Sequence, residues 1–261
     1  MIRLFYFALA ISLLVMTLHA CDFIEPDTDK PFPEGMASVR VVNLAPLSTS
    51  ISYFHKDQVV FNNIDFGDVT GYADVEVGYN VDGFLSAGGD TLRARREAFR
   101  DMPDDMRFFD FERTFTVYVL HSADSLAGYT YIRSMEIEPT PNAEGNARIR
   151  VLHAAPGVGA VDIYLASPGE EISEDNMFDE EIPFNNEGGS SAANNNSAPS
   201  EMPLYTTMPA GTYNVMLTLS GETDVVFEEE VTLNSSGNYT MVLYPKEDLT
   251  GVEKVLLLND N

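Results

Sequence analysis

The 261-residue sequence contains one cysteine, Cys21, and no tryptophan. A lone cysteine excludes an intramolecular disulfide, so side-chain burial has to stabilise the fold. Without tryptophan, the aromatic part of the core must come from 16 Phe and 12 Tyr. Cationic residues are also scarce, because 15 Lys and Arg stand against 41 Asp and Glu, a net charge of −26. Such an acidic chain repels phosphates, which argues against nucleic-acid binding.

A long apolar stretch stands at the N-terminus. Residues 4–18 are almost entirely apolar, follow Arg3 and end shortly before Cys21. At 15 residues the stretch is shorter than the roughly 20 that a permanent transmembrane helix needs. It resembles a bacterial lipoprotein signal peptide, which is cleaved before the cysteine that then carries lipid. We predict a signal peptide over residues 1–20 and lipidation of Cys21; a transmembrane anchor and an ordinary secretory signal are the alternatives.

The segment after the leader predicts where the protein is held. Residues 21–37 are acidic and rich in proline, as expected of an extended spacer in front of the first domain. Removal of the leader leaves 14 cationic and 41 acidic residues, a net charge of −27. We expect a lipid-anchored protein of the cell envelope, with the outer membrane or cell surface favoured over the inner membrane.

The chain contains an internal repeat with an offset of 110 residues. Residues 39–46, VRVVNLAP, align without gaps with residues 149–156, IRVLHAAP. A unit of this size exceeds the about 20 to 50 residues of solenoid repeats. The sequence therefore predicts two tandem domains, at residues 38–134 and 147–261, joined by a linker at residues 135–146 that contains proline and glycine.

Apolar and polar residues alternate in both repeats, which is typical of half-buried strands. Val215 and Leu217 follow this pattern in the second repeat, and Phe115, Val117 and Val119 follow it in the first. Many short strands separated by turns, without alternating helices, favour sandwiches over a parallel α/β sheet. We predict an all-β protein with two tandem antiparallel β-sandwich domains of immunoglobulin-like or transthyretin-like type.

Two positions refine the strand assignment. Residues 241–244, MVLY, are apolar on both faces and predict a central strand. Glu229 interrupts the apolar face of residues 225–233, which favours an edge strand or a bulge there.

Three motifs of the second repeat resemble the domain of unknown function 4397 family. They are residues 150–156 (RVLHAAP), 160–164 (AVDIY) and 208–213 (MPAGTY). The resemblance extends over about residues 147–258, and the first repeat matches more loosely over about residues 38–134. It implies a secreted or envelope-anchored β-rich module, often in tandem, without an established activity. The motif residues, for which we expect a structural more than a functional role, are His153, Pro156, Asp162, Tyr164, Gly211 and Tyr213.

His153 and Asp162 are the candidate catalytic pair, because a histidine held by an aspartate is the beginning of a nucleophilic triad. No serine in a sharp strand-to-helix turn accompanies them, and the first repeat has Asn43 and Ser52 at the equivalent positions. We therefore predict a non-catalytic protein, and the alternative is a hydrolase of envelope or extracellular polymer that uses His153 and Asp162. The other histidines of the mature chain, at positions 55 and 121, lack zinc-type spacing and are interpreted as surface or turn residues.

The second repeat has an acidic insertion that the first lacks. It contains Glu170, Glu171, Glu174, Asp175, Asp179, Glu180 and Glu181. The insertion lacks the alternating Asp/Asn and glycine of a calcium loop, so a solvated loop is favoured over the alternative of a calcium-dependent adhesion module. The Asn- and Ser-rich sequence that follows predicts disorder over residues 173–200. No metal and no cofactor is expected.

The first repeat has its own insertion with a cluster of arginines. The cluster consists of Arg93, Arg95, Arg96, Arg100, Arg107 and Arg113. We expect ion pairs with nearby Asp residues or with the acidic insertion, each adding only about 0 to 1 kcal/mol where exposed. The predicted partners are the membrane, through the N-terminal lipid, and a protein or glycan ligand, without nucleic acid. The sequence thus predicts a lipid-anchored envelope protein that displays two non-catalytic modules for binding or structural roles.

Overall fold

The structure is a computed structural model of the chain. It describes residues 35–46, 50–55, 58–77, 83–87, 90–92, 114–121, 130–137, 143–184, 187–188 and 205–260. These residues belong to one compact unit, residues 35–261. The predicted signal peptide, Cys21, residues 22–34 of the spacer and the arginine cluster lie outside the described residues. In the part of the chain that is described, no helix is long and apolar enough to cross a membrane.

The regular secondary structure of the described chain is almost entirely β-strand. The first half forms β1 (Gly35–Leu44), β2 (Ile51–His55), β3 (Gln58–Ile64), β4 (Ala73–Val77), β5 (Gly83–Ala87), β6 (Asp90–Leu92), β7 (Thr114–His121) and β8 (Thr130–Ile137). The second half forms β9 (Asn146–His153), β10 (Val161–Ala166), a 3-10 turn η2 (Glu174–Asn176), β11 (Met177–Ile182), β12 (Glu187–Gly188), β13 (Thr206–Pro209), β14 (Gly211–Leu219), β15 (Val225–Leu233), β16 (Asn238–Pro245) and β17 (Val252–Asn259).

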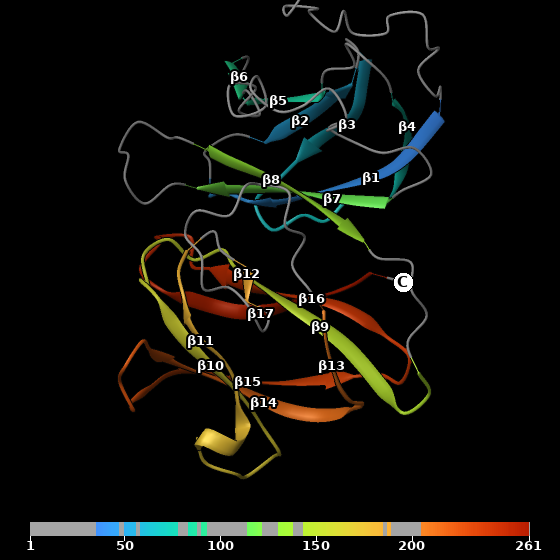
Figure 1. Cartoon of the computed structure of the whole chain (residues 1–261). Helices are drawn as coiled ribbons and strands as arrows, with labels where there is room; N and C mark the ends of the chain where they lie inside the picture. The colour runs from blue at the N-terminus through green and yellow to red at the C-terminus, as the bar shows by residue number, and fades with distance from the viewer. Residues whose placement is uncertain are drawn as a thin grey trace, which may run out of the picture. The chain divides into compact units, whose positions relative to one another are not determined.

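These strands form four sheets, two in each half of the chain (Figure 1). The first half has the orders β4-β1-β7-β8 and β3-β2-β5-β6. The second half has the orders β12-β9-β16-β17, with β13 also paired to β9, and β11-β10-β14-β15. Equivalent strands, such as β1 and β9 or β7 and β16, have equivalent neighbours. The prediction of two β-sandwich domains is therefore confirmed, and the sequence repeat corresponds to a repeat of topology.

Each sandwich contains one parallel strand pair, β1 with β7 and β9 with β16. The other named pairs are antiparallel. The parallel pairs arise because the chain leaves the first strand, builds the second sheet and returns beside its starting point. This return brings residues far apart in sequence into register, with Arg40 opposite Thr116 and Arg150 opposite Thr240.

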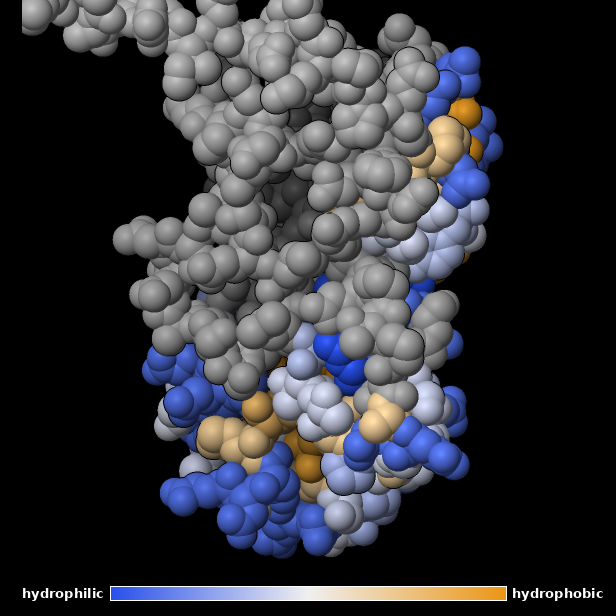
Figure 2. Space-filling view, turned by 45° about the vertical axis from the view of Figure 1, so that its right-hand side comes forward, coloured by the Kyte–Doolittle hydropathy of each residue, from blue (hydrophilic) through white to orange (hydrophobic). Residues whose placement is uncertain are grey.

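The predicted alternation places one face of each strand in a sandwich core. Val215 and Leu217 of β14 are fully buried in the second core, and Phe115, Val117 and Val119 of β7 are buried in the first. The interior of each sandwich is built from aliphatic side chains with a few aromatic ones, as the composition requires. On the face drawn in Figure 2, by contrast, most of the described surface is hydrophilic.

A third apolar cluster is formed by the opposite faces of the two sheets that contain β1 and β9. It consists of Val42, Leu44, Tyr118, Leu120, Leu152, Ala154, Val242, Tyr244 and Leu258, and we call it the interdomain face. Because it joins residues of both sandwiches, β1, β7, β9 and β16 have apolar side chains buried on both of their faces. This explains why residues 241–244 are apolar throughout, and β16 is indeed a central strand.

Glu229 lies on an edge strand, as its position in an apolar pattern predicted, because β15 ends the sheet order β11-β10-β14-β15. Its carboxylate accepts a hydrogen bond from the backbone N–H of Val255 on β17, the edge strand of the other sheet. A charged side chain thus bonds a backbone donor at the open side of the second sandwich.

The prediction of disorder over residues 173–200 is wrong for its first part. Residues 174–182 form η2 and β11, and β11 pairs with β10 (Figure 1). Three apolar residues of the acidic insertion pack against the rest of the domain. Ile182 is fully buried in the core, and Ile172 and Met177 pack against the cluster of Tyr164, Ala166 and Met216. These contacts stabilise the chain despite the charges between them. Residues 185–186 and 189–204 lie outside the described residues.

The strand limits can be compared with the predicted domain limits. β1 begins at Gly35, three residues inside the predicted spacer. β8 ends at Ile137, so the first three residues of the predicted linker belong to a strand. β9 begins at Asn146, the last residue of that linker.

Candidate functional site

His153 stands at the end of β9 and is fully buried. Its Nε2 donates a hydrogen bond to the backbone oxygen of Gly159 at 2.8 Å, and its Nδ1 accepts one from the backbone N–H of Ala155 at 3.2 Å. These bonds require a neutral ring with the proton on Nε2. Burial lowers the pKa of His153, against a smaller opposing effect of the bond to Gly159. Both ring nitrogens therefore stabilise the turn that follows β9.

Asp162 stands on the neighbouring sheet, in β10, and is 6% exposed. Its Oδ1 accepts a hydrogen bond from the backbone N–H of Glu181 at 2.8 Å, and its Oδ2 accepts one from the backbone N–H of Gly221 at 3.0 Å. The carboxylate thus ties β10 to the end of β11 and to the turn after β14. Glu181 has a φ of 52°, in the left-handed region, at a place where the register of β10 and β11 shifts.

The structure therefore gives His153 and Asp162 separate partners. Each side chain bonds two backbone groups, and neither of the two hydrogen-bonds the other. A catalytic histidine needs a free nitrogen toward the nucleophile and a carboxylate on the other nitrogen. The geometry of this pair fits a structural role and gives the predicted hydrolase alternative no support.

The first sandwich has a different side chain in a similar role. Asn43 replaces His153, and its Nδ2 donates to the backbone oxygen of Ile64 while its Oδ1 accepts from the backbone N–H of Ala45, each at 3.1 Å. Ala45 is equivalent to Ala155, so both side chains bond the backbone N–H two residues ahead. Ser52, at the position of Asp162, bonds Asn62.

The remaining motif residues also make turn or packing contacts within the second sandwich. The hydroxyl of Tyr213 donates to the backbone oxygen of Pro209 at 2.8 Å, which holds the turn before β14 in the manner of a tyrosine corner. Gly211 is the first residue of β14, and a Cβ added there would lie 3.7 Å from the ring of Tyr213. Pro156 and Tyr164 are buried, Pro156 in the turn after β9 and Tyr164 in the cluster that the acidic insertion covers.

Of the two histidines at positions 55 and 121, His55 differs from its interpretation as a surface or turn residue. His55 is buried rather than exposed, and its Nε2 donates to the backbone oxygen of Glu76 at 2.6 Å. The side chain of His121, at the end of β7, lies outside the described residues.

No group of three or more His, Cys, Asp or Glu side chains that could hold a metal ion is found among the residues that the structure describes. In the acidic insertion, several carboxylates bond nearby backbone N–H groups instead. Glu170 accepts from Ser167 at 3.1 Å, and Asp179 accepts from Glu180 at 3.0 Å.

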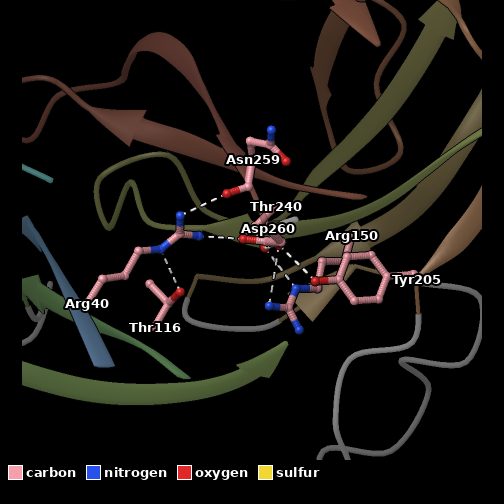
Figure 3. A network of polar contacts seen from close by, with 7 residues as sticks. All are labelled: Arg40, Thr116, Arg150, Tyr205, Thr240, Asn259 and Asp260. Carbon is pink, nitrogen blue, oxygen red and sulfur yellow. Dashed lines mark hydrogen bonds and ion pairs between the residues drawn. The ribbon is translucent and has the colours of Figure 1, made fainter. Parts of the chain in front are cut away.

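A network that sequence reasoning missed connects the two sandwiches through buried charges (Figure 3). Arg40 of β1 donates from Nε to Thr116 Oγ1 at 2.8 Å, and Arg150 of β9 donates from Nε to Thr240 Oγ1 at 2.8 Å. Both guanidinium groups face Asp260, which follows β17. The two arginines are 6% and 1% exposed, so these ion pairs are shielded from solvent.

Asp260 has further partners within the second sandwich. Thr240 and Tyr205 donate hydrogen bonds to its Oδ2 at 2.6 and 2.8 Å, and Arg150 Nη2 lies 3.6 Å from the same oxygen (Figure 3). On the side of the first sandwich, Arg40 pairs with Asp260 Oδ1 and donates from Nη1 to the backbone oxygen of Asn259 at 2.9 Å. We call these residues the Asp260 network.

Tyrosine rings enclose the network. The Arg40 guanidinium carbon lies 5.0 Å from the centroid of Tyr72, and that of Arg150 lies 4.5 Å from the centroid of Tyr205. Burial raises the pKa of Tyr118 to about 12, with an added contribution from the charge of Asp260. Burial likewise raises the pKa values of Tyr205 and Tyr72. These hydroxyls stay protonated, and that of Tyr205 serves as a donor to the buried carboxylate.

Comparison with known proteins agrees with the resemblance seen in the motifs. Residues 37–164 match the profile of a family described as a domain of unknown function, DUF4397, which the chain resembles. The match begins in β1, spans the rest of the first sandwich and continues through β9 into β10, including His153 and Asp162. Beyond Tyr164 the resemblance of the second repeat stays a prediction. A search of curated proteins found no significant match.

Proposed function

We propose that the protein is a lipoprotein of the cell envelope, in which Cys21 carries the lipid and the two β-sandwiches act as a non-catalytic binding or structural module. The position of Cys21 is the observation on which this proposal rests. It is the one cysteine of the chain and follows directly after a short apolar leader that has a basic residue, Arg3, near its start. A free thiol outside the cytoplasm would be reactive, and acylation would remove it.

The chain after Cys21 suits display at a distance from the membrane. Residues 22–34 contain Asp, Glu and Pro and precede the start of β1 at Gly35. At roughly 3 Å per residue, an extended segment of this length would hold the first sandwich some tens of ångströms from the lipid. The strongly acidic composition would keep the displayed domains away from anionic lipid surfaces.

The motif residues support a non-catalytic role. His153 and Asp162 each bond two backbone groups, and in the first sandwich Asn43 makes the same bond to the backbone N–H two residues ahead that His153 makes. With both ring nitrogens bonded to the backbone, the imidazole of His153 has neither a free lone pair nor a free proton to offer a substrate. We therefore infer that contacts with a protein or glycan ligand come from loops and outer faces of the sandwiches.

Metabolic labelling tests the anchor. The full chain, expressed in a bacterial host with an alkynyl fatty acid, should incorporate the label and sediment with membranes. Cys21→Ser should abolish both. The matched control is Cys21→Ser combined with Val226→Cys, which restores one thiol at a position that is 51% exposed and far from the leader in sequence. Labelling of this control, or an unlabelled wild-type protein with its leader intact, would refute the lipoprotein assignment.

A second experiment tests the absence of catalysis. The mature chain with Cys21→Ser is screened for binding to purified glycans and envelope polymers, and the same polymers are assayed for hydrolysis. We expect binding without turnover. Hydrolysis that disappears in both His153→Asn and Asp162→Asn, with the fold retained by circular dichroism, would show that the hydrolase alternative is correct.

A further inference from the structure

The two sandwiches meet through equivalent faces. Val42 and Leu44 of β1 correspond to Leu152 and Ala154 of β9, and all four belong to the interdomain face. Tyr118 and Leu120 of β7 correspond in the same way to Val242 and Tyr244 of β16. Apolar contact of this kind is strong but non-directional, so it favours association without fixing one angle. Something directional has to select the arrangement.

The Asp260 network is directional and spans this face. Arg40 belongs to the first sandwich, whereas Asp260 belongs to the second, and their ion pair joins the two. Arg150, Thr240 and Tyr205 hold the same carboxylate from within the second sandwich. Asp260 is thereby oriented toward Arg40, and the bond from Arg40 to the backbone of Asn259 adds a second anchor point beside it.

We propose that Asp260 is a latch that couples the two sandwiches into one rigid, cooperatively unfolding body. One member of the latch directly follows β17, the last described strand, and the other lies in β1, the first described strand, 220 residues away. It therefore closes only when both sandwiches are complete. Without the carboxylate of Asp260, the buried guanidinium of Arg40 would have no charge partner in a low-dielectric environment. An unpaired buried charge is strongly destabilising. The coupling is independent of whether Cys21 is lipidated, so its test does not depend on the proposed anchor.

Distance measurements between spin labels test the latch. The mature chain with Cys21→Ser contains no cysteine, so labels attach only where cysteine is introduced. Val59→Cys in the first sandwich and Val226→Cys in the second are suitable, because these side chains are 52% and 51% exposed. We expect a single narrow distance distribution for this pair. In Asp260→Asn the distribution should broaden at least twofold. Glu253→Gln, which removes an exposed carboxylate from β17, the strand before Asp260, should leave it narrow.

A label pair inside one sandwich separates hinging from unfolding. Val226→Cys with Glu174→Cys reports only on the second sandwich and should stay narrow in Asp260→Asn. If Asp260→Asn unfolds that sandwich, Arg40→Met provides the test, because it leaves Asp260 bonded to Arg150, Thr240 and Tyr205. Arg40→Met must then broaden the distance between the sandwiches alone.

Calorimetry gives an independent readout of the same coupling. We expect one unfolding transition in the parent protein and two separate transitions in Arg40→Met. Combining Arg40→Met with Asp260→Asn should lower the first transition by clearly less than the sum of the single effects. A broad parent distribution, or an unchanged width in both variants with additive effects on Tm, would overturn the proposal.

Discussion

Asn43 and His153 occupy equivalent positions in the two sandwiches and accept the same hydrogen bond, from the backbone N–H two residues ahead, with different side chains. Each accepts from the backbone N–H two residues ahead and donates to a backbone carbonyl. The amide does this without a titratable group, whereas the imidazole does it only when neutral. The turn after the first strand is therefore insensitive to pH in one sandwich and sensitive in the other.

This difference predicts a pH dependence of stability that belongs to His153. Burial lowers its pKa in the folded state, so the folded protein binds a proton less readily than the unfolded chain. The contribution of His153 is fully present above the unfolded pKa of about 6.5 and is lost as the pH falls below it, by at most about 1.4 kcal/mol per pH unit. Urea unfolding between pH 5 and pH 8 measures this slope.

Substitution of the histidine isolates the effect. His153→Asn should flatten the slope and keep the bond to Ala155, whereas His153→Leu should flatten it and also cost about 1 to 3 kcal/mol at pH 8, because the backbone groups lose their partner. A slope in His153→Asn as steep as in the wild type would assign the pH dependence to other groups.

Gly157, in the turn after β9, lies against the backbone of the turn between β16 and β17. A Cβ added at Gly157 would lie 1.6 Å from the carbonyl oxygen of Leu249, a backbone atom that cannot swing away. Leu249 itself has a φ of 61°, so that turn has little freedom to move. Gly157→Ala should therefore lower the free energy of unfolding by at least about 2 kcal/mol, measured by urea titration.

The control for this prediction is Gly71→Ala. An added Cβ at Gly71 has nothing within 4 Å, and Gly71 is not among the glycines with positive φ. Its effect should stay within about 0.5 kcal/mol. Equal losses in the two variants would show that the contact with Leu249 is not responsible.

The fold could be predicted from the sequence because period-two patterning reports burial directly. The pattern predicted that Val215 and Leu217 lie in the core and that Glu229 lies on an edge strand. The parallel pairing of β1 with β7 could not be predicted, because alternation says which face is buried and nothing about the direction of a neighbour. The regular structure of residues 174–182 was not predicted, because the seven carboxylates of the insertion outnumber the few apolar residues that pack against the domain.

The Asp260 network shows why long-range polar sites escape sequence reasoning. Arg40 and Arg150 align at the repeat offset inside apolar strands, and this signal was available from the sequence alone. Their common partner is a single carboxylate near the C-terminus with no counterpart at the repeat offset. Only the return of β17 beside β16 places Asp260 between the arginines.

We expect Asp162 to be a structural residue, so that its substitution lowers the free energy of unfolding. Asp162→Ala removes the acceptor for two backbone N–H groups, of Glu181 and Gly221, each costing about 1 to 3 kcal/mol if left buried without a partner. Urea titration should therefore show a loss of at least about 2 kcal/mol. Ser52→Ala, at the equivalent position of the first sandwich, should lose less than about 0.5 kcal/mol, since Ser52 bonds only at an exposed site. Comparable losses would contradict this assignment.

Glu229 is expected to keep the second sandwich monomeric. Its carboxylate bonds Val255 on the edge strand β17, and a charge on an edge discourages pairing with the edge of another molecule. Glu229→Val removes the charge, frees the backbone donor and completes the apolar face of β15. We expect this variant to self-associate at micromolar concentration in sedimentation velocity experiments. Glu230→Val, an equal change at the exposed neighbour on the same strand, should remain monomeric, and association of both variants alike would trace the effect to added hydrophobicity instead of the open edge.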